Sequence, residues 1–283
     1  DAARAALNKL ELFVVSENVR SNDTVNVGAH VLLPAQAWGE KSGTVTNSER
    51  RISRQRGFVE PAGETKPDWW IVSEVARRMG HAEAFGFDGP AAIFREHAAL
   101  SGFENNGRRA FDLGALAGMD AAAYDAMAPV QWPVRQSGHG TPRLFAQGHY
   151  PTATGRARMI ARMPRGPARA TSAAQPFVFN TGRVRDQWHT MSRTGKTPRL
   201  LAHIAEPYIE MHPTDAATAN VRAGGLARVR SGRGEMLARV VVSADQRPGS
   251  VFAPIHWNGQ NAARARVDAL VYAFHQPGET CQV

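Results

Sequence analysis

The first part of the chain carries two short apolar runs separated by a polar stretch. Residues 10–16 read LELFVVS and residues 30–35 read HVLLPA. Continuous apolar runs of this length are typical of strands buried in a parallel sheet. We therefore predict two buried parallel strands of an α/β sheet. Ligands collect at the carboxyl ends of such strands, which places Ser16 and Glu17 at the edge of a possible site.

Two later segments carry the start and stop signals of helices. PDWWIVSEVARRMG, residues 67–80, begins with Pro-Asp, has arginines in its last turn and ends at glycine. GPAAIFREHAALSG, residues 89–102, places Pro90 in its first turn. Residues 36–56, rich in Gly, Thr and Asn, predict a loop. Residues 103–170 predict a long irregular connection with a hairpin at 143–152, and residues 163–176 predict a linker.

From residue 177 onward the pattern becomes one of short strands separated by turn signals. The strand-like segments read PFVFN, YIEM, LARVR, MLARVVVS and VFAPIHW, and two of them flank SGRGE as a hairpin. HPTDAATAN, between YIEM and LARVR, predicts a short helix that begins at Pro213. This part of the chain is typical of a compact β-barrel domain.

Composition narrows the class of protein. The chain has 283 residues, of which 43% are hydrophobic and 21% charged, enough for one large core or two modest ones. No apolar run approaches the roughly 20 residues of a membrane-spanning helix, so we expect a soluble protein with no membrane partner. The chain begins without Met, a basic leader or a twin-arginine signal, and we expect that it is a truncated piece of a longer protein.

The basic balance and the single cysteine narrow the partners. The net charge is +9, and only four of the 34 basic residues are lysines. Arginine suits bidentate binding of phosphates, although an arginine-rich genome would give the same composition. The arginines form no basic stripe with interleaved aromatics, so we expect no nucleic-acid partner. Cys281 alone forms no disulfide framework or cysteine-rich metal site, and it favours a reducing, cytoplasmic setting.

The densest group of polar side chains follows the strand PFVFN. Residues 180–190 read NTGRVRDQWHT, and the glycine allows close approach of the backbone to a ligand. Arg183 and Arg185 suit phosphates, Asp186 and Gln187 suit the edge of a nucleobase, and His189 suits an oxyanion. Alternatively, these residues have a structural role and bind no ligand: Arg185 and Asp186 pair with each other on the surface, and Trp188 is buried in the core.

Four stretches together resemble a known family. They read GRVRDQWHTMSRTGK, WGEKSGTVTNSERRISRQR, PGETKPDWWIVSEVARRMG and VFAPIHW. From about Leu10 to Ala273, the chain resembles the carboxy-terminal part of molybdopterin oxidoreductases of the dimethyl-sulfoxide-reductase superfamily. The form DQWHTMSRTGK is most similar to bacterial assimilatory nitrate reductases.

The resemblance implies a fold and cofactors. It implies the end of a Rossmann-like α/β domain over residues 1–80, a helical or irregular return segment and linker over 81–170, and a double-psi β-barrel that binds molybdopterin dinucleotide over 171–283. Such enzymes hold molybdenum between two molybdopterin guanine dinucleotides. The molybdenum ligand and a 4Fe–4S cluster are expected outside this sequence, so we assign no catalytic residue and no metal ligand within it.

The resemblance also implies which residues contact the cofactor. Side-chain chemistry supports this role for Asp68 and Lys41. An Asp carboxylate can accept two hydrogen bonds from a guanine edge, and a lysine offers a point charge to a pyrophosphate. The predicted cofactor-binding residues are Ser16, Glu17, Lys41, Asp68, Thr181, Gly182, Arg183, Val184, Arg185, Asp186, Gln187, Trp188, His189, Thr190, His256 and Asp268.

Several of these residues have structural alternatives. Asp68 suits a helix N-cap, and Lys41 suits a solvated loop. His256 and Trp257, at a strand end, suit packing. Asp268 stands where relatives often carry Asn, and no lysine follows it. Beside these candidates, the residue types of Glu49, Arg50 and Arg51 predict an ion-pair cluster, and an arginine fork toward phosphate is the competing interpretation.

The implied reaction is reduction of nitrate to nitrite by oxygen-atom transfer. The implied partners are nitrate, the remainder of the chain and an electron donor such as ferredoxin, flavodoxin or an NADH-linked reductase subunit. One alternative keeps the cofactor and changes the enzyme to a formate dehydrogenase or a periplasmic-type nitrate reductase. The other is a non-enzymatic, basic nucleotide- or RNA-binding fragment.

Overall fold

The chain forms two compact units. The computed structural model describes residues 2–135, 139–164, 170–271 and 279–281. One unit contains residues 1–10, 21–28 and 163–283, and the other contains residues 11–20 and 29–162. The domain boundaries predicted at residues 80 and 170 stay predictions, and residues 165–169 of the predicted linker lie outside the described residues.

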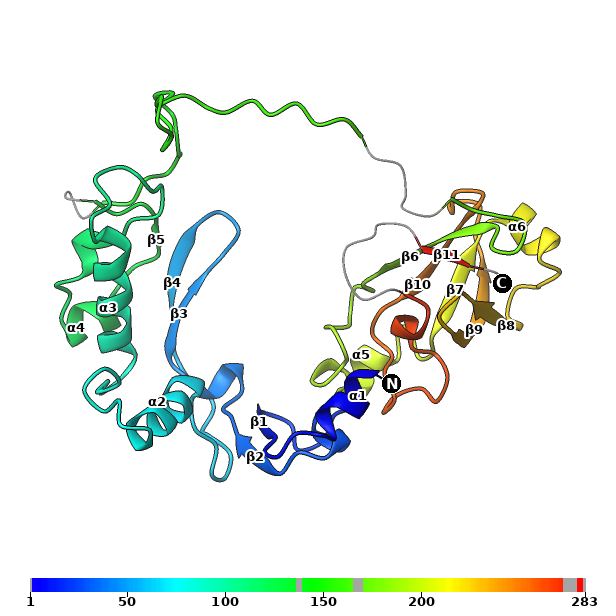
Figure 1. Ribbon diagram of the computed structural model, residues 1–283, viewed down its shortest axis with the longest axis horizontal. Helices are drawn as coiled ribbons and strands as arrows, with labels where there is room; N and C mark the ends of the chain where they lie inside the picture. Colours follow the sequence, from blue (N-terminus) through cyan, green and yellow to red (C-terminus); the bar gives the residue numbers. More distant parts are fainter. Residues whose placement is uncertain (1, 136–138, 165–169, 272–278, 282–283) are drawn as a thin grey trace. The chain divides into compact units, whose positions relative to one another are not determined.

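The unit that contains residues 163–283 is built on a curled, mixed sheet of six strands (Figure 1). Their order is β11-β6-β10-β7-β9-β8. The pairs β6–β10 and β7–β9 are parallel, and the other three neighbouring pairs are antiparallel. The strands are β6 (Phe177–Gly182), β7 (Tyr208–Met211), β8 (Leu226–Arg230), β9 (Glu235–Val242), β10 (Ser250–Pro254) and β11 (Glu279–Cys281).

The predicted hairpin of this unit is confirmed. Strands β8 and β9 pair antiparallel, from Leu226 opposite Arg239 to Arg230 opposite Glu235. Burial alternates strictly along β8, because successive side chains of a strand point to opposite faces. Val229 is therefore fully buried, whereas Arg230 pairs with Glu235 across the exposed face at 3.2 Å.

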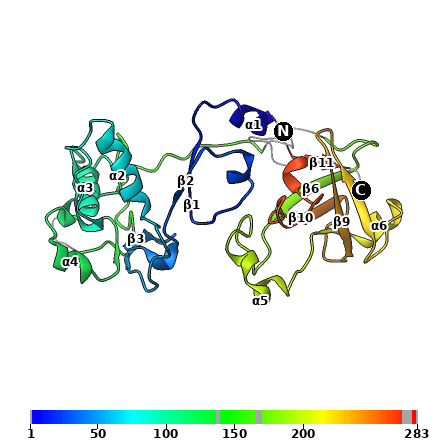
Figure 2. The ribbon, with the colours of Figure 1, turned by 90° about the horizontal axis from the view of Figure 1, so that it is seen from below.

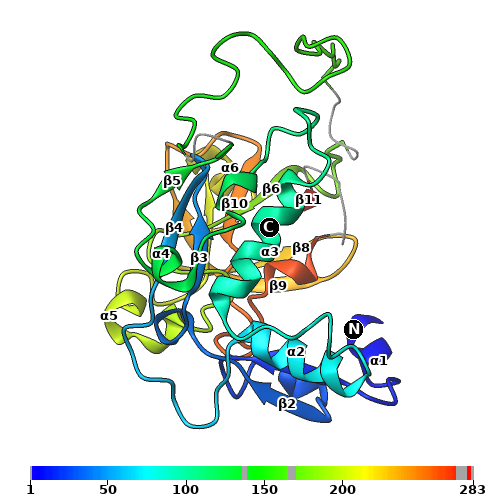
Figure 3. The same ribbon diagram turned by 90° about the vertical axis from the view of Figure 1, so that its left-hand side faces the viewer.

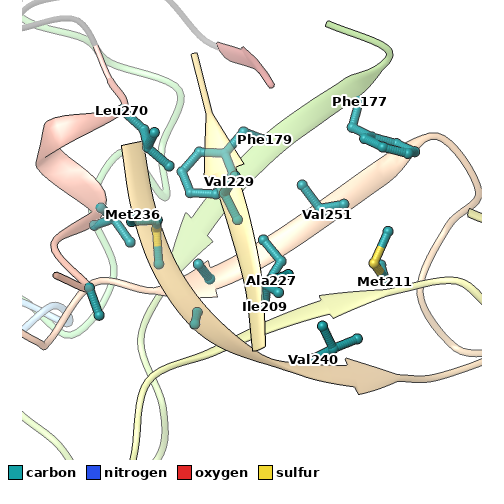
Figure 4. Packing of buried hydrophobic residues seen from close by; sticks show 14 of the residues in the cluster. Phe177, Phe179, Ile209, Met211, Ala227, Val229, Met236, Val240, Val251 and Leu270 are labelled. Atoms are coloured by element: carbon teal, nitrogen blue, oxygen red, sulfur yellow. The ribbon is translucent and has the colours of Figure 1, made fainter. Parts of the chain in front are cut away.

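The core of this unit lies against the inner face of the sheet. Ile209, Met211, Val229 and Val251 are fully buried at its centre (Figure 4). Burying a side chain of this size stabilises a fold by about 1.5–3 kcal/mol. Helices in this unit are α1 (Ala2–Leu7), α5 (Pro198–Leu201) and α6 (Pro213–Thr218), with short 3-10 turns at Val25–Val27, Thr194–Lys196 and Val267–Ala269. As predicted, α6 begins at Pro213.

The other unit packs helices against a small antiparallel sheet (Figure 3). Its buried cluster joins Ile52 of the sheet to Phe94 and Ala98 of a helix, and adds Leu113 and Tyr124 from the following segment. The sheet contains β3 (Gly43–Thr46), β4 (Arg51–Gln55) and β5 (Val130–Gln131), and the helices are α2 (Asp68–Arg78), α3 (Pro90–Gly102) and α4 (Ala121–Asp125), with 3-10 turns at Trp38–Glu40 and Gly114–Leu116.

The two predicted helices of this unit are confirmed, and the predicted loop at 36–56 is wrong. Strands β3 and β4 form a hairpin there. Asn47 Oδ1 accepts hydrogen bonds from the backbone N–H groups of Glu49 and Arg51, each at 3.0 Å, and fixes the turn. The pattern did not indicate these strands because Val45 and Ile52 are their only two apolar residues, and only Ile52 is buried.

The predicted parallel strand pair is confirmed, but its burial is wrong. Strand β1 (Val14–Glu17) runs parallel to β2 (Val31–Pro34) in a sheet of two strands (Figure 2). Leu12 is 65% exposed, and Val14 and Val31 are also exposed, whereas Val15, Leu32 and Leu33 are only partly buried. The hairpin predicted at 143–152 is also wrong, since turns replace strands and the rings of Phe145 and Tyr150 stack 4.6 Å apart.

No helix in the described ranges has both the length and the apolar character to cross a membrane.

Candidate functional site

The main candidate site is residues 181–190, the last two residues of β6 and the loop that follows them, here called the 181–190 loop. Strand β10 runs parallel beside β6, so residues 255–258 leave the same edge of the sheet. The N–H of Ile255 donates to the carbonyl of Gly182 at 2.9 Å and holds the two exits together. A Cβ atom on Gly182 would lie 2.9 Å from the ring of Phe252, so a larger residue here would require that ring to move.

Part of the loop faces the protein interior. Val184 and Gln187 are buried. The carboxamide oxygen of Gln187 accepts from the hydroxyl of Thr194 at 2.7 Å, and its nitrogen donates to the carbonyl of Leu200 at 3.4 Å. In this structure Gln187 therefore connects the loop to residues 194–200, and its predicted contact with a nucleobase stays a prediction.

The opposite face of the loop is exposed and combines positive charge with aromatic rings. The guanidinium of Arg183 lies over the ring of Trp188, 4.8 Å from its centre. Trp188 is 48% exposed, so it is not a core residue. The ring of His189 packs edge-on against Trp188 with centres 4.3 Å apart. Arg183, Trp188 and His189 thus form one exposed cationic and aromatic surface.

Arg185 and Asp186 form the surface ion pair that the structural alternative anticipated. Arg185 Nε lies 3.0 Å from Asp186 Oδ1, and Nδ1 of His203 lies 2.6 Å from Asp186 Oδ2. The hydrogen bond from Arg185, followed by that from His203, holds the pKa of Asp186 below its usual range. Asp186 is therefore ionised at neutral pH and neutralises part of the charge of Arg185.

His256 is fully buried and holds both ends of the loop. The backbone N–H of Val184 donates to its Nε2 at 2.9 Å, and its Nδ1 lies 2.6 Å from the carbonyl oxygen of His189. Because Nε2 accepts, Nδ1 must carry the proton and donate. Burial lowers the pKa of His256, which keeps the ring neutral. Both ring nitrogens are thereby bonded to the loop, and a direct contact of His256 with a cofactor stays a prediction.

Asn258 is a residue of this site that the sequence reasoning missed. Its Nδ2 donates to the carbonyl of Thr190 at 2.9 Å. Its Oδ1 accepts from the N–H of Gln260 at 2.9 Å and from Nδ2 of Asn261 at 3.3 Å. The turn sequence NGQN directly after His256 and Trp257 was the available signal. Asp268, by contrast, lies in a 3-10 turn, 3.6 Å from Arg266 Nε.

The second group of predicted residues belongs to the other unit. Lys41 Nζ lies 2.5 Å from Asp68 Oδ2, so the structure brings these two candidates together. The N-cap of α2 is Pro67, and Asp68 is the first helical residue, so the N-cap alternative for Asp68 is wrong. Ser16 and Glu17 end β1, and a carboxylate oxygen of Glu17 accepts from the N–H of Asn18 at 2.8 Å.

The segment around Lys41 is held by a neighbouring carboxylate. Glu40 accepts from the N–H of Ala37 at 2.6 Å and from that of Ala62 at 3.1 Å, which joins residues 37–41 to the loop before α2. Nearby, Glu49 pairs with Arg51 at 3.0 Å, whereas Arg50 donates to backbone carbonyls, among them that of Pro142 at 3.0 Å. The structure therefore confirms the ion pair for Glu49 and Arg51, whereas Arg50 is bonded to backbone carbonyls and is not part of it.

The exposed side chains of the 181–190 loop suit a ligand that carries both phosphate groups and an aromatic ring. The loop itself carries Arg183 and Arg185, of which Arg185 pairs with the carboxylate of Asp186, and three further arginine or lysine side chains follow in residues 191–200. Guanidinium groups match phosphate oxygens in bidentate geometry, and an exposed ring offers a stacking surface. Within the residues that the structure describes, no group of three or more His, Cys, Asp or Glu side chains is arranged to hold a metal ion.

Comparison with known proteins gives matches over most of the chain. Residues 1–78 match the family model described as molybdopterin oxidoreductase, and residues 177–277 match the Molydopterin dinucleotide binding domain. These matches support a molybdopterin cofactor. The 181–190 loop and residues 255–258 lie inside the second match.

Similar proteins include two nitrate reductases. That of Klebsiella oxytoca is 49% identical over 98% of this chain and 31% of its own length, and that of Shewanella frigidimarina is 39% identical over 98% of this chain and 32% of its own length. The chain thus spans about a third of the length of these relatives.

A solved structure shows the same fold. Acetylene hydratase from Pelobacter acetylenicus matches with a TM-score of 0.71 and 15% identity, covering 97% of this chain and 40% of that chain. The chain therefore contains a molybdopterin oxidoreductase segment and a molydopterin dinucleotide binding domain, and it is similar to nitrate reductases over almost its whole length.

Proposed function

We propose that this chain is part of a molybdenum nitrate reductase that reduces nitrate to nitrite by oxygen-atom transfer in nitrate assimilation. The observation that carries the proposal is the 49% identity to a nitrate reductase across 98% of the chain. The contribution of this chain is to bind the organic part of the cofactor. The chemistry of nitrate belongs to the molybdenum centre, which when bound would supply two electrons to nitrate and accept the oxygen atom that nitrate loses.

We infer that the cofactor is bis-molybdopterin guanine dinucleotide and that the 181–190 loop binds one of its dinucleotide tails. Arg183 and its neighbouring cations suit the phosphates, and Trp188 offers an exposed ring. The backbone of this loop is fixed from below by His256, so its donors are held in place before a ligand arrives. The curled sheet that carries the loop is then a double-psi barrel, and the segment with β1 and β2 is Rossmann-like.

Lys41 and Asp68 fit a second dinucleotide contact, together with Ser16 and Glu17. In this structure the lysine and the aspartate neutralise each other, with 28% and 58% of their side chains exposed. An exposed ion pair contributes only about 0–1 kcal/mol. A pyrophosphate and a guanine edge can therefore replace the pair at small cost, which makes the observed contact compatible with cofactor binding. Asp268 stays a candidate contact of the same kind.

The remaining partners complete the proposal. A 4Fe–4S cluster in the part of the protein beyond this chain passes electrons from ferredoxin, flavodoxin or an NADH-linked reductase subunit. The enzyme works in the reducing cytoplasm, without a nucleic-acid or membrane partner. No residue of this chain acts as a catalytic residue or a molybdenum ligand.

The test uses the purified full-length protein that contains this chain. We expect molybdenum, guanine nucleotide released on denaturation, and nitrite formed from nitrate with a reduced donor dye. Carbon dioxide formed from formate, with no nitrite from nitrate, would instead indicate the formate dehydrogenase alternative. Salt-sensitive binding to nucleic acid without molybdenum would indicate the basic nucleotide- or RNA-binding fragment.

A further inference from the structure

The end of the 181–190 loop has a backbone conformation that its residues rarely adopt. His189 has a φ of 36° and Met191 a φ of 58°, both in the left-handed region although neither is glycine. Non-glycine residues persist in this region only when the surrounding structure holds them there. Such positions gather at ligand-binding sites, where a fixed conformation is part of the function.

Two side chains from the exit of β10 hold this turn. His256 Nδ1 donates to the carbonyl of His189 at 2.6 Å, and Asn258 Nδ2 donates to the carbonyl of Thr190 at 2.9 Å. Together they bond the two consecutive carbonyls between the left-handed residues. His256 Nε2 also accepts from the N–H of Val184, so the start and the end of the loop are bonded to one ring.

The orientation of both side chains is itself fixed. The N–H of Val184 allows only the His256 tautomer with the proton on Nδ1. For Asn258, the N–H of Gln260 and Nδ2 of Asn261 both donate to Oδ1, which leaves the nitrogen to face Thr190. The turn that contains Asn258 is held further by the N–H of Gly259, which donates to Asp23 at 3.2 Å.

We propose that His256 and Asn258 are positioning residues that hold the 181–190 loop in its ligand-binding conformation before the molybdopterin dinucleotide binds. The inference rests on the proposed function, because it takes this loop as the dinucleotide site. Neither residue needs to touch the cofactor. Their effect is to remove the cost of ordering a strained turn at the moment of binding, and a loop fixed in its bound conformation gains affinity from that saving.

The competing account is that His256 and Asn258 only pack the end of the sheet. Packing and positioning differ in what a substitution changes. Substituting a packing residue lowers the melting temperature and leaves the cofactor bound equally tightly in the folded protein. Substituting a positioning residue weakens cofactor retention even where the protein still folds.

The experiment uses the full-length protein with Asn258→Asp, which removes the donor to Thr190 without changing side-chain size. The matched control is Gln260→Glu, two residues along, because it adds the same charge and its side-chain amide donates to Ser21 and not to the 181–190 loop. The rate of cofactor release is followed by fluorescence of the freed pterin. We expect Asn258→Asp to accelerate release about tenfold or more, since an unsatisfied carbonyl faces a carboxylate, and Gln260→Glu to leave the rate within about twofold.

Two substitutions of His256 test its two hydrogen bonds, to His189 and to Val184, one at a time. His256→Asn places an amide near Nδ1 and keeps a donor to His189, whereas His256→Gln places one near Nε2 and keeps an acceptor for Val184. We expect each to release cofactor faster than the wild type, and we expect ¹⁵N spectra of histidine-labelled wild type to show His256 protonated on Nδ1. Wild-type release rates in Asn258→Asp, or a proton on Nε2 of His256, would overturn the positioning role.

The two proposals fail differently. If the wild-type protein holds no molybdopterin dinucleotide, both fall. If the wild type and Gln260→Glu hold it and Asn258→Asp retains it as tightly, only the positioning role falls. If either His256 variant does not fold, Asn258→Asp decides alone, because Asn258 is only half-buried.

Discussion

Lys41 Nζ lies 2.5 Å from Asp68 Oδ2, so two residues 27 positions apart, each a candidate cofactor contact, are bonded to each other. The lysine follows the 3-10 turn Trp38–Glu40, and the aspartate begins α2. The bond neutralises two charges that a dinucleotide would otherwise meet. When a ligand binds a site of this kind, each side chain exchanges its internal partner for the ligand. Substitutions at the pair should therefore change the stability of the protein little and the retention of the cofactor strongly.

We predict that Lys41→Met and Asp68→Asn each lower the free energy of unfolding by less than about 1 kcal/mol, since the pair is partly exposed. Cofactor release from the full-length protein should accelerate about tenfold in each variant. Urea denaturation and pterin fluorescence measure the two effects. The control is Arg239→Met, which breaks an exposed pair with Glu206 at the same distance of 2.5 Å. Loss of several kcal/mol with unchanged release would contradict the prediction.

The buried His256 predicts how stability depends on pH. Burial lowers its pKa in the folded state below the value of about 6.5 in the unfolded state. The unfolded state therefore binds the additional proton first as the pH falls. The stability that the neutral ring contributes is fully present above about pH 6.5 and is lost as the pH falls below it, until the lowered folded-state pKa is reached.

This dependence can be measured as the free energy of unfolding between pH 7.5 and 5. We expect His256→Gln to flatten the acidic slope relative to the wild type. His212→Gln is the control, because His212 is not buried and caps the first turn of α6. An equal slope in wild type and His256→Gln would contradict the role of burial.

The core of the curled sheet predicts a large effect at one position and a small effect at another. Ile209 is fully buried, and Ile209→Ala should cost about 2–5 kcal/mol through lost burial and a cavity. Leu226, at an exposed position of β8, is 69% exposed, and Leu226→Ala should change the free energy of unfolding by about 0.5 kcal/mol or less. Chemical denaturation checks both. Similar costs at the two positions would contradict the assigned faces.

The sequence predicted those elements that are bounded by turn or terminal signals. LARVR and MLARVVV flank the turn SGRGE and form β8 and β9, in which burial alternates, and Pro90 begins α3. The hairpin of β3 and β4 was missed because its residues are mostly polar, and what fixes its turn is the side chain of Asn47. The burial predicted for residues 10–16 was wrong because an apolar run does not say whether neighbours cover it.

The candidate site was predicted in composition but not in arrangement. The donors of NTGRVRDQWHT do lie in one loop, yet Gln187 faces inward, Asp186 pairs with Arg185, and Arg183 lies over Trp188. Asn258 was missed because its role depends on a carbonyl 68 positions away in the chain. Contacts of this range follow from the parallel pairing of β6 and β10, which periodicity alone does not reveal.

The central claim is that the 181–190 loop binds the dinucleotide of a molybdopterin cofactor, and Arg183→Ala in the full-length protein tests it most directly. The matched control is Arg228→Ala, which removes an exposed arginine of the same unit from β8. The measurement is the molar ratio of molybdenum and guanine nucleotide to purified, folded protein. We predict a loss of cofactor of about tenfold in Arg183→Ala and none in Arg228→Ala, since a guanidinium bound to phosphate contributes about 1.5–3 kcal/mol. Full occupancy in folded Arg183→Ala would contradict the claim.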